Sequence, residues 1–211
     1  MAIEKALDVI LNTGSKIKII RLFISRRPDF MASGRGIARL INLTAPAAHA
    51  ALKQLYDQDI LKREIIGREH IYKLNVDNRI VKNILEPAFR KELSVKKDIF
   101  DFLKKEIKTT KMQDKIISLL LYGSLQTGTT GEKSDVDIAI ITKDKTAKKR
   151  IEDIFTEDVA NQFYDYFGVH LDIYVKTKGE FIKRFKENQP PVSELMRAYS
   201  VVYGKDPAEF K

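Results

Sequence analysis

The sequence predicts an α/β (α+β) protein with two domains, and three observations support that prediction. Residues 1–76 read as short helices followed by a β-hairpin, whereas residues 114–211 alternate apolar strands with helices. Residues 77–113 have the spacing of helices and lack the composition of a flexible linker. The chain has 211 residues, of which 44% are hydrophobic, enough to fill two cores. We therefore expect a helical domain with a hairpin, connecting helices, and a domain with a small mixed sheet flanked by helices.

Composition excludes several kinds of site. The chain has no Cys, which rules out disulfides, thiolate zinc sites and Cys nucleophiles, and its three His argue against a His-rich metal site. A metal ion would be held mainly by oxygen atoms, which favours Mg²⁺ or Mn²⁺. No apolar run approaches the roughly 20 residues of a membrane span, and the N-terminus lacks a signal-peptide pattern. We expect no membrane partner and a cytoplasmic location.

The net charge is positive and unevenly distributed. The formal charge is +9, and residues 1–75 hold 13 Lys and Arg against 7 Asp and Glu. A basic excess favours encounter with polyanions such as nucleic acids. Ordinary enzymes with lysine-rich surfaces reach similar totals, so charge alone does not decide the partner.

The first domain reads as three helices and a hairpin. Apolar residues between 17 and 24 follow a helical stripe that "RRPDF" ends, and residues 37–41 suggest a second short helix. In the third helix Thr44 is the predicted N-cap and Pro46 lies in the first turn. Two β-rich runs then flank Gly67-Arg68, which predicts a short hairpin.

The stretch "ASGRGIARLINLTAPAAHAALKQLYDQDILKREIIGREHIYKLN" resembles the winged helix-turn-helix domain of bacterial and archaeal transcription regulators, and the resemblance covers about residues 12–75. It implies that the third helix enters the major groove of DNA and that the hairpin, the wing, contacts phosphate or the minor groove. The implied DNA-binding residues are Thr44, Ala45, His49, Lys53 and Arg68, with Ala47 and Ala48 beside them.

Other interpretations of the first domain remain open. His49 and Lys53 also fit solvated positions, and winged helices serve in some proteins as docking modules for other proteins. Regulators of this type are commonly dimers, so the resemblance also suggests a homodimer. In the connecting helices, Glu86-Pro87 is the expected place of a kink or division.

The second domain places two carboxylates at the start of an apolar strand. "IISLLLYGS" and "SDVDIAIIT" read as strands, a helical segment covers about 151–166, and "FGVHLDIYVK" reads as a strand with Asp172 near its middle. Side chains alternate along a strand, so Asp135 and Asp137 share a face. Two like charges at the edge of a core are costly unless a cation neutralises them. Asp172 can supply a third carboxylate from an adjacent strand, and the set suits Mg²⁺.

An alternative makes Asp135 a turn residue and Asp137 a solvent-facing side chain, and an isolated Asp-x-Asp would favour it. Here Gly123-Ser124 ends the preceding strand, where Gly permits close backbone approach and Ser can hold a phosphate. Together with Asp172, this turn makes a metal and phosphate site the preferred interpretation.

The combination of Gly123-Ser124, a Gly-containing loop through Gly128 and Ser134-Asp135-Val136-Asp137 resembles the nucleotidyltransferase fold of the DNA polymerase beta superfamily. The match is to its minimal branch, related to the kanamycin nucleotidyltransferase type, and extends over about 100–211 to the tail at Val201–Gly204. The resemblance implies transfer of a nucleoside monophosphate from a nucleoside triphosphate, with ATP expected, to an acceptor hydroxyl. The implied catalytic and metal-binding residues are Asp135, Asp137 and Asp172, and the implied nucleotide-binding residues are Gly123, Ser124, Lys133 and Ser134.

One residue departs from the family pattern. Minimal nucleotidyltransferases usually carry an Arg just before the loop glycine, and here Thr127 stands there, preceded by Gln126. Lys133 is a candidate to compensate. The departure favours a second hypothesis, a DNA-binding regulator whose nucleotidyltransferase-like domain only senses nucleotide. The family also suggests a third, in which the domain docks a helical partner protein in an antitoxin-like role.

Overall fold

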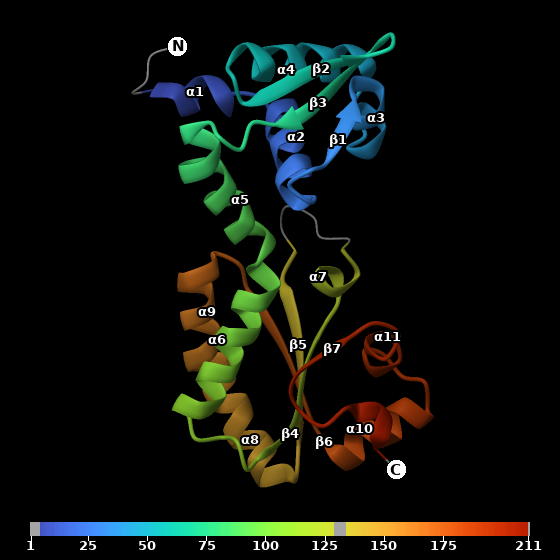
Figure 1. Cartoon of the computed structure of the whole chain (residues 1–211). Coiled ribbons are helices and arrows are strands. Elements are labelled where there is room, and N and C mark those ends of the chain that lie inside the picture. Colours follow the sequence, from blue (N-terminus) through green and yellow to red (C-terminus); the bar gives the residue numbers. More distant parts are fainter. Residues whose placement is uncertain (1–4, 129–133, 211) are drawn as a thin grey trace. The chain divides into compact units, whose positions relative to one another are not determined.

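The computed structural model describes residues 5–128 and 134–210 and divides the chain after Val95 into two compact units. Figure 1 shows the elements of each unit, and each unit is described here by itself. The segment 77–113, expected as a connection, is shared between them: its first part packs in the first unit and its remainder opens the second. Among the described residues, no helix combines the length and the apolar character needed to cross a membrane.

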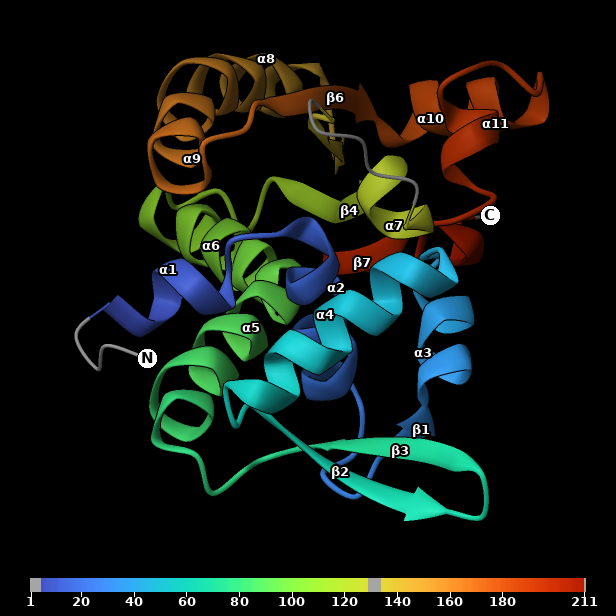
Figure 2. The same ribbon diagram turned by 90° about the horizontal axis from the view of Figure 1, so that it is seen from above.

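The first unit has the element order of a winged helix. Its strands form an antiparallel sheet in the order β1-β3-β2, with Arg63 opposite Tyr72, and Gly67 makes the hairpin turn with a positive φ of 62°. Figure 2 shows β2 and β3 side by side as a long hairpin. The elements are α1 (Ala6–Ile10), α2 (Gly14–Ser25), β1 (Met31–Ser33), α3 (Gly34–Leu40), α4 (Ala45–Asp57), β2 (Leu61–Ile66), β3 (Glu69–Leu74), η2 (Val81–Leu85) and α5 (Glu86–Leu93). The winged-helix prediction is confirmed by this order and register.

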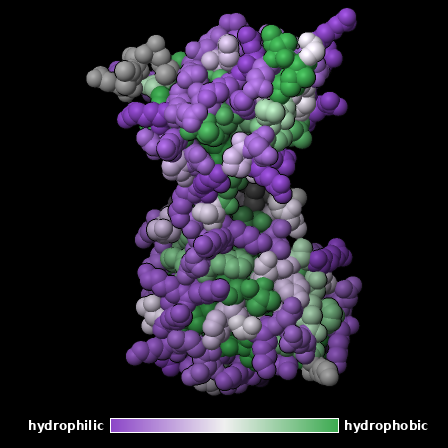
Figure 3. All heavy atoms as spheres, viewed as in Figure 1, coloured by the Kyte–Doolittle hydropathy of each residue, from purple (hydrophilic) through white to green (hydrophobic). Residues whose placement is uncertain are grey.

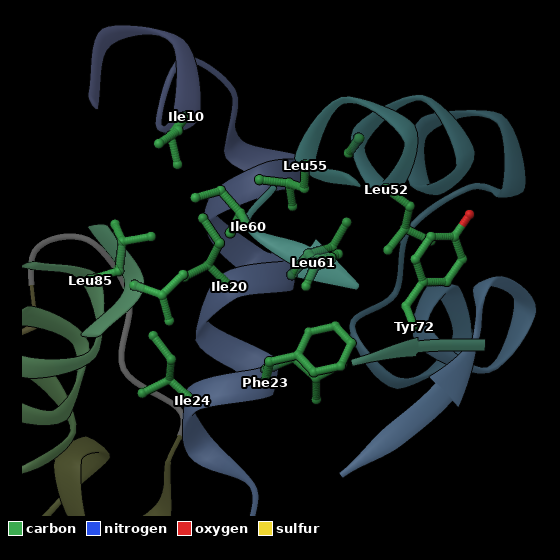
Figure 4. Close-up of a cluster of buried hydrophobic side chains, with 14 of the residues drawn as sticks. Ile10, Ile20, Phe23, Ile24, Leu52, Leu55, Ile60, Leu61, Tyr72 and Leu85 are labelled. Atoms are coloured by element: carbon green, nitrogen blue, oxygen red, sulfur yellow. The ribbon is translucent and has the colours of Figure 1, made fainter. Parts of the chain in front are cut away.

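The core of the first unit lies between α2, α4 and the sheet. Ile20 and Phe23 of α2 belong to one buried cluster with Leu52 and Leu55 of α4 and with Tyr72 of β3 (Figure 4). All of these side chains are buried, so their apolar surface is removed from water and stabilises the packing. The cap predicted for the third helix is confirmed, because Thr44 Oγ1 accepts a hydrogen bond from the Ala47 N–H at 3.4 Å.

Helix type changes where the sequence predicted a break. The π-helical turn η2 ends at Leu85, and α5 begins at Glu86 with Pro87 in its first turn. Helical structure is continuous through this point, so Pro87 removes an N–H from the helix, and the π-helical turn lies directly before it. The chain then leaves α5 at Ser94 and enters α6 (Val95–Thr109).

The second unit is built on a mixed sheet in the order β6-β5-β4-β7. β5 and β6 run parallel and are connected through α8, η3 and α9, whereas β4 is antiparallel to both of its neighbours. The elements after α6 are β4 (Ile116–Tyr122), α7 (Ser124–Thr127), β5 (Val136–Thr142), α8 (Lys145–Ile154), η3 (Phe155–Val159), α9 (Ala160–Phe167), β6 (Leu171–Thr177), α10 (Lys178–Lys186), α11 (Val192–Leu195), β7 (Ser200–Gly204) and η4 (Pro207–Glu209).

Each face of this sheet has its own core. Alternate strand residues such as Leu119 and Ile138 pack under α6, α8 and α9, while Leu120 and Ala139 pack on the opposite face with α10 and α11. Figure 1 shows the two groups of helices on opposite sides of the strands. The visible surface is mostly hydrophilic, with scattered apolar residues (Figure 3). The central strands β4 and β5 are therefore buried on both faces, and functional side chains are confined to the strand ends.

Candidate active site

Two of the predicted carboxylates occupy paired positions on neighbouring strands. β5 and β6 are in parallel register with Asp137 opposite Asp172, so these two residues share a face and lie about one strand spacing, roughly 4.8 Å, apart. Asp135 immediately precedes β5 and is exposed, while Val136 is buried in the core beneath α6. The alternation predicted for Asp135, Val136 and Asp137 is thus confirmed by burial. Asp172, expected near the middle of its strand, is instead the second residue of β6.

A glycine turn presses against Asp137. Gly123 follows β4 with φ 74° and ψ −154°, a conformation that is almost restricted to glycine. A Cβ atom at this position would lie 1.9 Å from Oδ2 of Asp137, so the turn can approach the carboxylate only because residue 123 has no side chain. The backbone N–H of the next residue, Ser124, donates a hydrogen bond to that carboxylate. The predicted Gly-Ser turn therefore touches the predicted metal ligand.

The charges at this edge of the sheet repel one another. Partial burial raises the pKa of Asp137 above its ordinary value, and the charges of Asp172 and Asp135 raise it further, while the hydrogen bond from Ser124 opposes the shift. Tyr122, opposite Asp137 on β4, is also affected: burial and then the nearby carboxylates raise the pKa of its hydroxyl. A concentration of negative charge that perturbs its neighbours is a common property of functional sites.

The donor chemistry of the three carboxylates fits a hard divalent cation. Carboxylate oxygens are the ligands that Mg²⁺ prefers, and the repulsion that raises the pKa of Asp137 is what a bound cation would relieve. As the side chains stand, the part of the chain that is described contains no group of three His, Asp or Glu spaced as a metal site. The strand register brings the backbones of Asp137 and Asp172 together, and Asp135 directly precedes the same strand as Asp137. The exposed side chains of Asp135 and Asp172 would have to turn toward a bound ion.

This geometry agrees with a family comparison. Residues 104–196 match the family model described as polymerase beta, nucleotidyltransferase. Residues 104–196 form a nucleotidyltransferase domain. The match includes β4, the turn, β5 and β6, and therefore contains all three carboxylates.

A curated protein that is similar to part of the chain is archaeal. It comes from Methanocaldococcus jannaschii, bears the name "putative protein adenylyltransferase", and is 27% identical over 97 residues. The alignment covers 46% of this chain and 64% of the relative, so the chain spans less than two thirds of that protein's length.

Several solved structures are similar to part of the chain. HlyU from Vibrio cholerae is 17% identical, with 43% of this chain and 96% of that chain covered at a TM-score of 0.34. A homodimeric winged helix-turn-helix DNA-binding domain from Mycobacterium bovis is 15% identical, with 42% and 77% covered at a TM-score of 0.34. Because these scores are low, the fold of the first unit is assigned from its own elements and register.

In the second unit, a polar network holds the short helix α7. Gln126 Oε1 accepts hydrogen bonds from Lys96 Nζ at 2.5 Å and from Ser200 Oγ at 2.8 Å, and Gln126 Nε2 donates to the carbonyl of Tyr199 at 3.3 Å. Thr127, which stands where the family usually has Arg, donates from its hydroxyl to the carbonyls of Gly123 and Ser124 at 3.3 Å. Sequence reasoning missed Lys96, because nothing in the sequence indicates its proximity to a residue 30 positions away. It also missed Tyr122, although that residue directly precedes the Gly-Ser turn.

The other two predicted nucleotide-binding residues are Ser134 and Lys133. Ser134 is partly buried and precedes Asp135. Lys133 lies outside the described residues. Gly123 and Ser124 are therefore the predicted phosphate-binding residues whose contact with the carboxylates is described.

In the first unit, a concavity of about 560 Å³ lies between α3, α4 and the wing. It brings together three of the predicted DNA-binding residues, Ala45, His49 and Arg68, and adds Arg35 and His70, which sequence reasoning missed. Thr44 and Lys53 are exposed, and Lys53 pairs with Asp57 at 2.8 Å, which offsets its charge. Ala48 is buried at 1% exposure because it faces the core, so it cannot contact a base.

Proposed function

We propose that this protein is a metal-dependent nucleotidyltransferase with an attached DNA-binding winged helix. The observation that supports the enzyme most strongly is the register that places Asp137 opposite Asp172, with the Gly123-Ser124 turn against Asp137. Carboxylates beside an exposed backbone turn can serve both the metal and the phosphate groups of one substrate.

Each residue has a role in this proposal. Asp135, Asp137 and Asp172 would hold Mg²⁺ or Mn²⁺, which supplies charge neutralisation at the phosphates when bound. Gly123, Ser124, Ser134 and Lys133 would hold the triphosphate. The acceptor oxygen attacks the α-phosphorus, and the bond between the α-phosphorus and the oxygen of the leaving pyrophosphate breaks. Asp172 accepts the proton of the acceptor hydroxyl. The products are a nucleotidylated acceptor and pyrophosphate.

The proposed substrates are ATP and an acceptor with a hydroxyl group. The name of the archaeal relative refers to adenylyl transfer to protein, which supports ATP as the donor and a protein hydroxyl as the first acceptor to test. An RNA end and a small molecule are the other acceptor classes. The domain is proposed to work inside the cytoplasm, where ATP and Mg²⁺ are plentiful.

The test is transfer of label from ATP labelled at the α-phosphate. Asp137→Asn should lower transfer about a thousandfold or more, because metal binding contributes several kcal/mol to the transition state. Asp165→Asn, which changes an exposed Asp of α9 in the same unit, should transfer normally. Undiminished transfer by Asp137→Asn would contradict the proposed site.

The winged-helix fold and the convergence of Arg35, His49 and Arg68 on one concavity support DNA binding by the first unit. A mobility-shift assay at low salt, where electrostatic affinity is greatest, tests this part separately. Failure to shift any duplex there would remove DNA from the proposal and leave the transferase intact. A homodimer is proposed with it, to be checked by the mass of the particle in solution.

A second candidate function is a regulator that senses nucleotide without transferring it. Thr127 favours it, because its hydroxyl is engaged with backbone carbonyls of the turn and adds no positive charge. In this case nucleotide and Mg²⁺ would change the affinity for DNA while no label is transferred to any acceptor. A third hypothesis is that the domain docks a helical partner protein in an antitoxin-like role. Co-purification of a small helical protein would support it.

A further inference from the structure

Lys96 places a positive charge beside the helix that follows the Gly-Ser turn. Its Nζ donates to Oε1 of Gln126 at 2.5 Å and to Oγ of Ser200 at 3.1 Å, and it lies 5.9 Å from the ring centroid of Phe100. These contacts hold the ammonium group at a fixed place, although Lys96 belongs to α6, far from the turn in sequence.

The charge of Lys96 is not balanced by its contacts. The oxygens of Gln126 and Ser200 are neutral, and within the described residues no carboxylate pairs with Lys96. The side chain is half-buried, unlike that of its neighbour Lys97, which is exposed. A partly desolvated cation held by neutral oxygens retains attraction for an anion, and its ammonium group has three N–H donors, of which the two contacts use two.

The position of Lys96 relative to the carboxylates follows from the strand order. Ser200 opens β7 and pairs with Leu121, one residue before Tyr122, so Lys96 lies at the same edge of the sheet as the active site. Along the order β6-β5-β4-β7 this edge presents Asp172, Asp137, the Gly123-Ser124 turn and then Lys96. Negative groups thus stand on one side of the turn and a cation on the other. α7 itself, with the sequence Ser-Leu-Gln-Thr, carries no charge.

We propose that Lys96 binds the terminal phosphates of the nucleoside triphosphate. The metal-binding carboxylates and Lys96 would then hold the triphosphate from opposite sides of the turn, with the α-phosphorus toward the carboxylates and the terminal phosphates toward α6. This inference rests on the proposed function, because it assigns a substrate group to the same site. It makes Lys96 a substrate-binding residue and Gln126 and Ser200 the residues that position it.

Binding of an unreactive nucleotide tests the assignment in the full-length protein. The probe is an ATP analogue with a methylene bridge between the α- and β-phosphates, titrated with Mg²⁺ present, and AMP is the comparison ligand. Lys96→Met should weaken binding of the triphosphate about tenfold or more, as expected when a hydrogen bond to a charged group is lost, and should leave AMP binding unchanged. Lys97→Met removes the same charge from the next residue and should bind like wild type.

Two further variants separate charge from positioning. Lys96→Gln keeps a hydrogen-bond donor near Gln126 without the charge and should bind as weakly as Lys96→Met, whereas Lys96→Arg should retain most of the affinity. Thermal unfolding of each variant checks that the fold is intact. Wild-type triphosphate affinity in Lys96→Gln, or equal loss for AMP and the triphosphate, would overturn the assignment.

The same experiment distinguishes failure of this assignment from failure of the proposed function. If wild type binds the triphosphate and transfers label, but Lys96→Met binds normally, only the Lys96 assignment falls. If wild type binds with Lys96-dependent affinity but transfers no label, the assignment stands and the transferase proposal fails. If wild type does not bind the triphosphate, both fall.

Discussion

Asp137 experiences opposing interactions in the folded protein. Burial and the carboxylates of Asp172 and Asp135 disfavour its charged form, while the Ser124 N–H favours it. The net effect is a raised pKa, so the folded state binds a proton at this group more tightly than the unfolded chain does. The charged carboxylate therefore costs stability in the absence of a cation, and that cost appears as pH rises through the ordinary Asp range to the raised pKa.

A thermal-unfolding series in metal-free buffer measures this cost. Asp137→Asn should have a higher Tm than wild type at neutral pH, and the difference should shrink as pH falls below the ordinary Asp range, where both side chains are neutral. Added Mg²⁺ should raise the Tm of wild type and leave that of Asp137→Asn nearly unchanged. If Asp137→Asn were less stable than wild type at neutral pH without metal, the result would contradict a raised pKa of Asp137.

Individual site residues differ in how far the sequence predicts them. The spacing of Asp135 and Asp137 predicts a shared face, which agrees with the burial of Val136 between them, and the Gly-Ser pair predicts a turn, which the structure confirms. Lys96 could not be predicted, because its partners Gln126 and Ser200 lie 30 and 104 residues farther along the chain and meet it only through the packing of the folded unit. Such contacts leave no periodicity or spacing in the sequence.

At the level of elements, the turn between β4 and α7 combines two demands on one glycine. Gly123 has a positive φ, and the space of a side chain is occupied by Asp137. Gly168, at the end of α9, has a similar φ of 70°, but a Cβ there would meet no atom within 4 Å. Gly168 is therefore a control for a positive φ without contact with a carboxylate, although its ψ of 16° differs from the −154° of Gly123.

Gly123→Ala should therefore lose both stability and transfer, whereas Gly168→Ala should lose stability alone. We expect about 1 kcal/mol for Gly168, whose φ of 70° and ψ of 16° are left-handed helical, and a larger loss at Gly123, whose ψ of −154° is less accessible to Ala and where the carboxylate must also move. Chemical denaturation and the α-label transfer assay measure the two effects. Normal transfer by Gly123→Ala would show that the turn does not fix the position of Asp137.

Strands and helices were predicted to different degrees. β4 and β5 are apolar runs bounded by Gly and Asp, and their extents agree with the sequence interpretation. Asp172 was expected farther inside its strand, because the sequence does not reveal that β6 begins only at Leu171. The boundary within the connecting segment, at Val95, depends on which core each helix packs against, and helical periodicity does not carry that information.

The molecule as a whole combines a basic first unit with a second unit whose functional edge is acidic. The net charge of +9 therefore does not describe the candidate active site, where partial burial and then neighbouring carboxylates raise the pKa values of Asp137 and Tyr122. In the first unit, the concavity beside α4 and the wing is lined by Arg35, Arg68 and two His, against one acidic residue, Glu69. Charge of opposite sign at the two sites favours different ligands for each.

Arg68→Ala should weaken binding to duplex DNA of any sequence and reduce the salt dependence of binding by about one unit of slope, as expected for a phosphate contact. Lys82→Ala removes an exposed charge of the same unit outside the concavity and should have a smaller effect. Affinity measured across several salt concentrations gives both slopes. Equal slopes for wild type and Arg68→Ala would place the wing away from the phosphates.

The hydrogen bond from the Ser124 N–H to Asp137 joins two parts of the site into one thermodynamic unit. A ligand that moves the turn must change the environment of the carboxylate, and an ion bound by the carboxylate must change the position of the turn. Linkage makes any such influence reciprocal, so if the proposed nucleotide strengthens binding of the proposed metal ion, the metal ion strengthens nucleotide binding by the same factor. Coupling between the two proposed ligands would thus depend on one glycine that allows the backbone to touch a carboxylate.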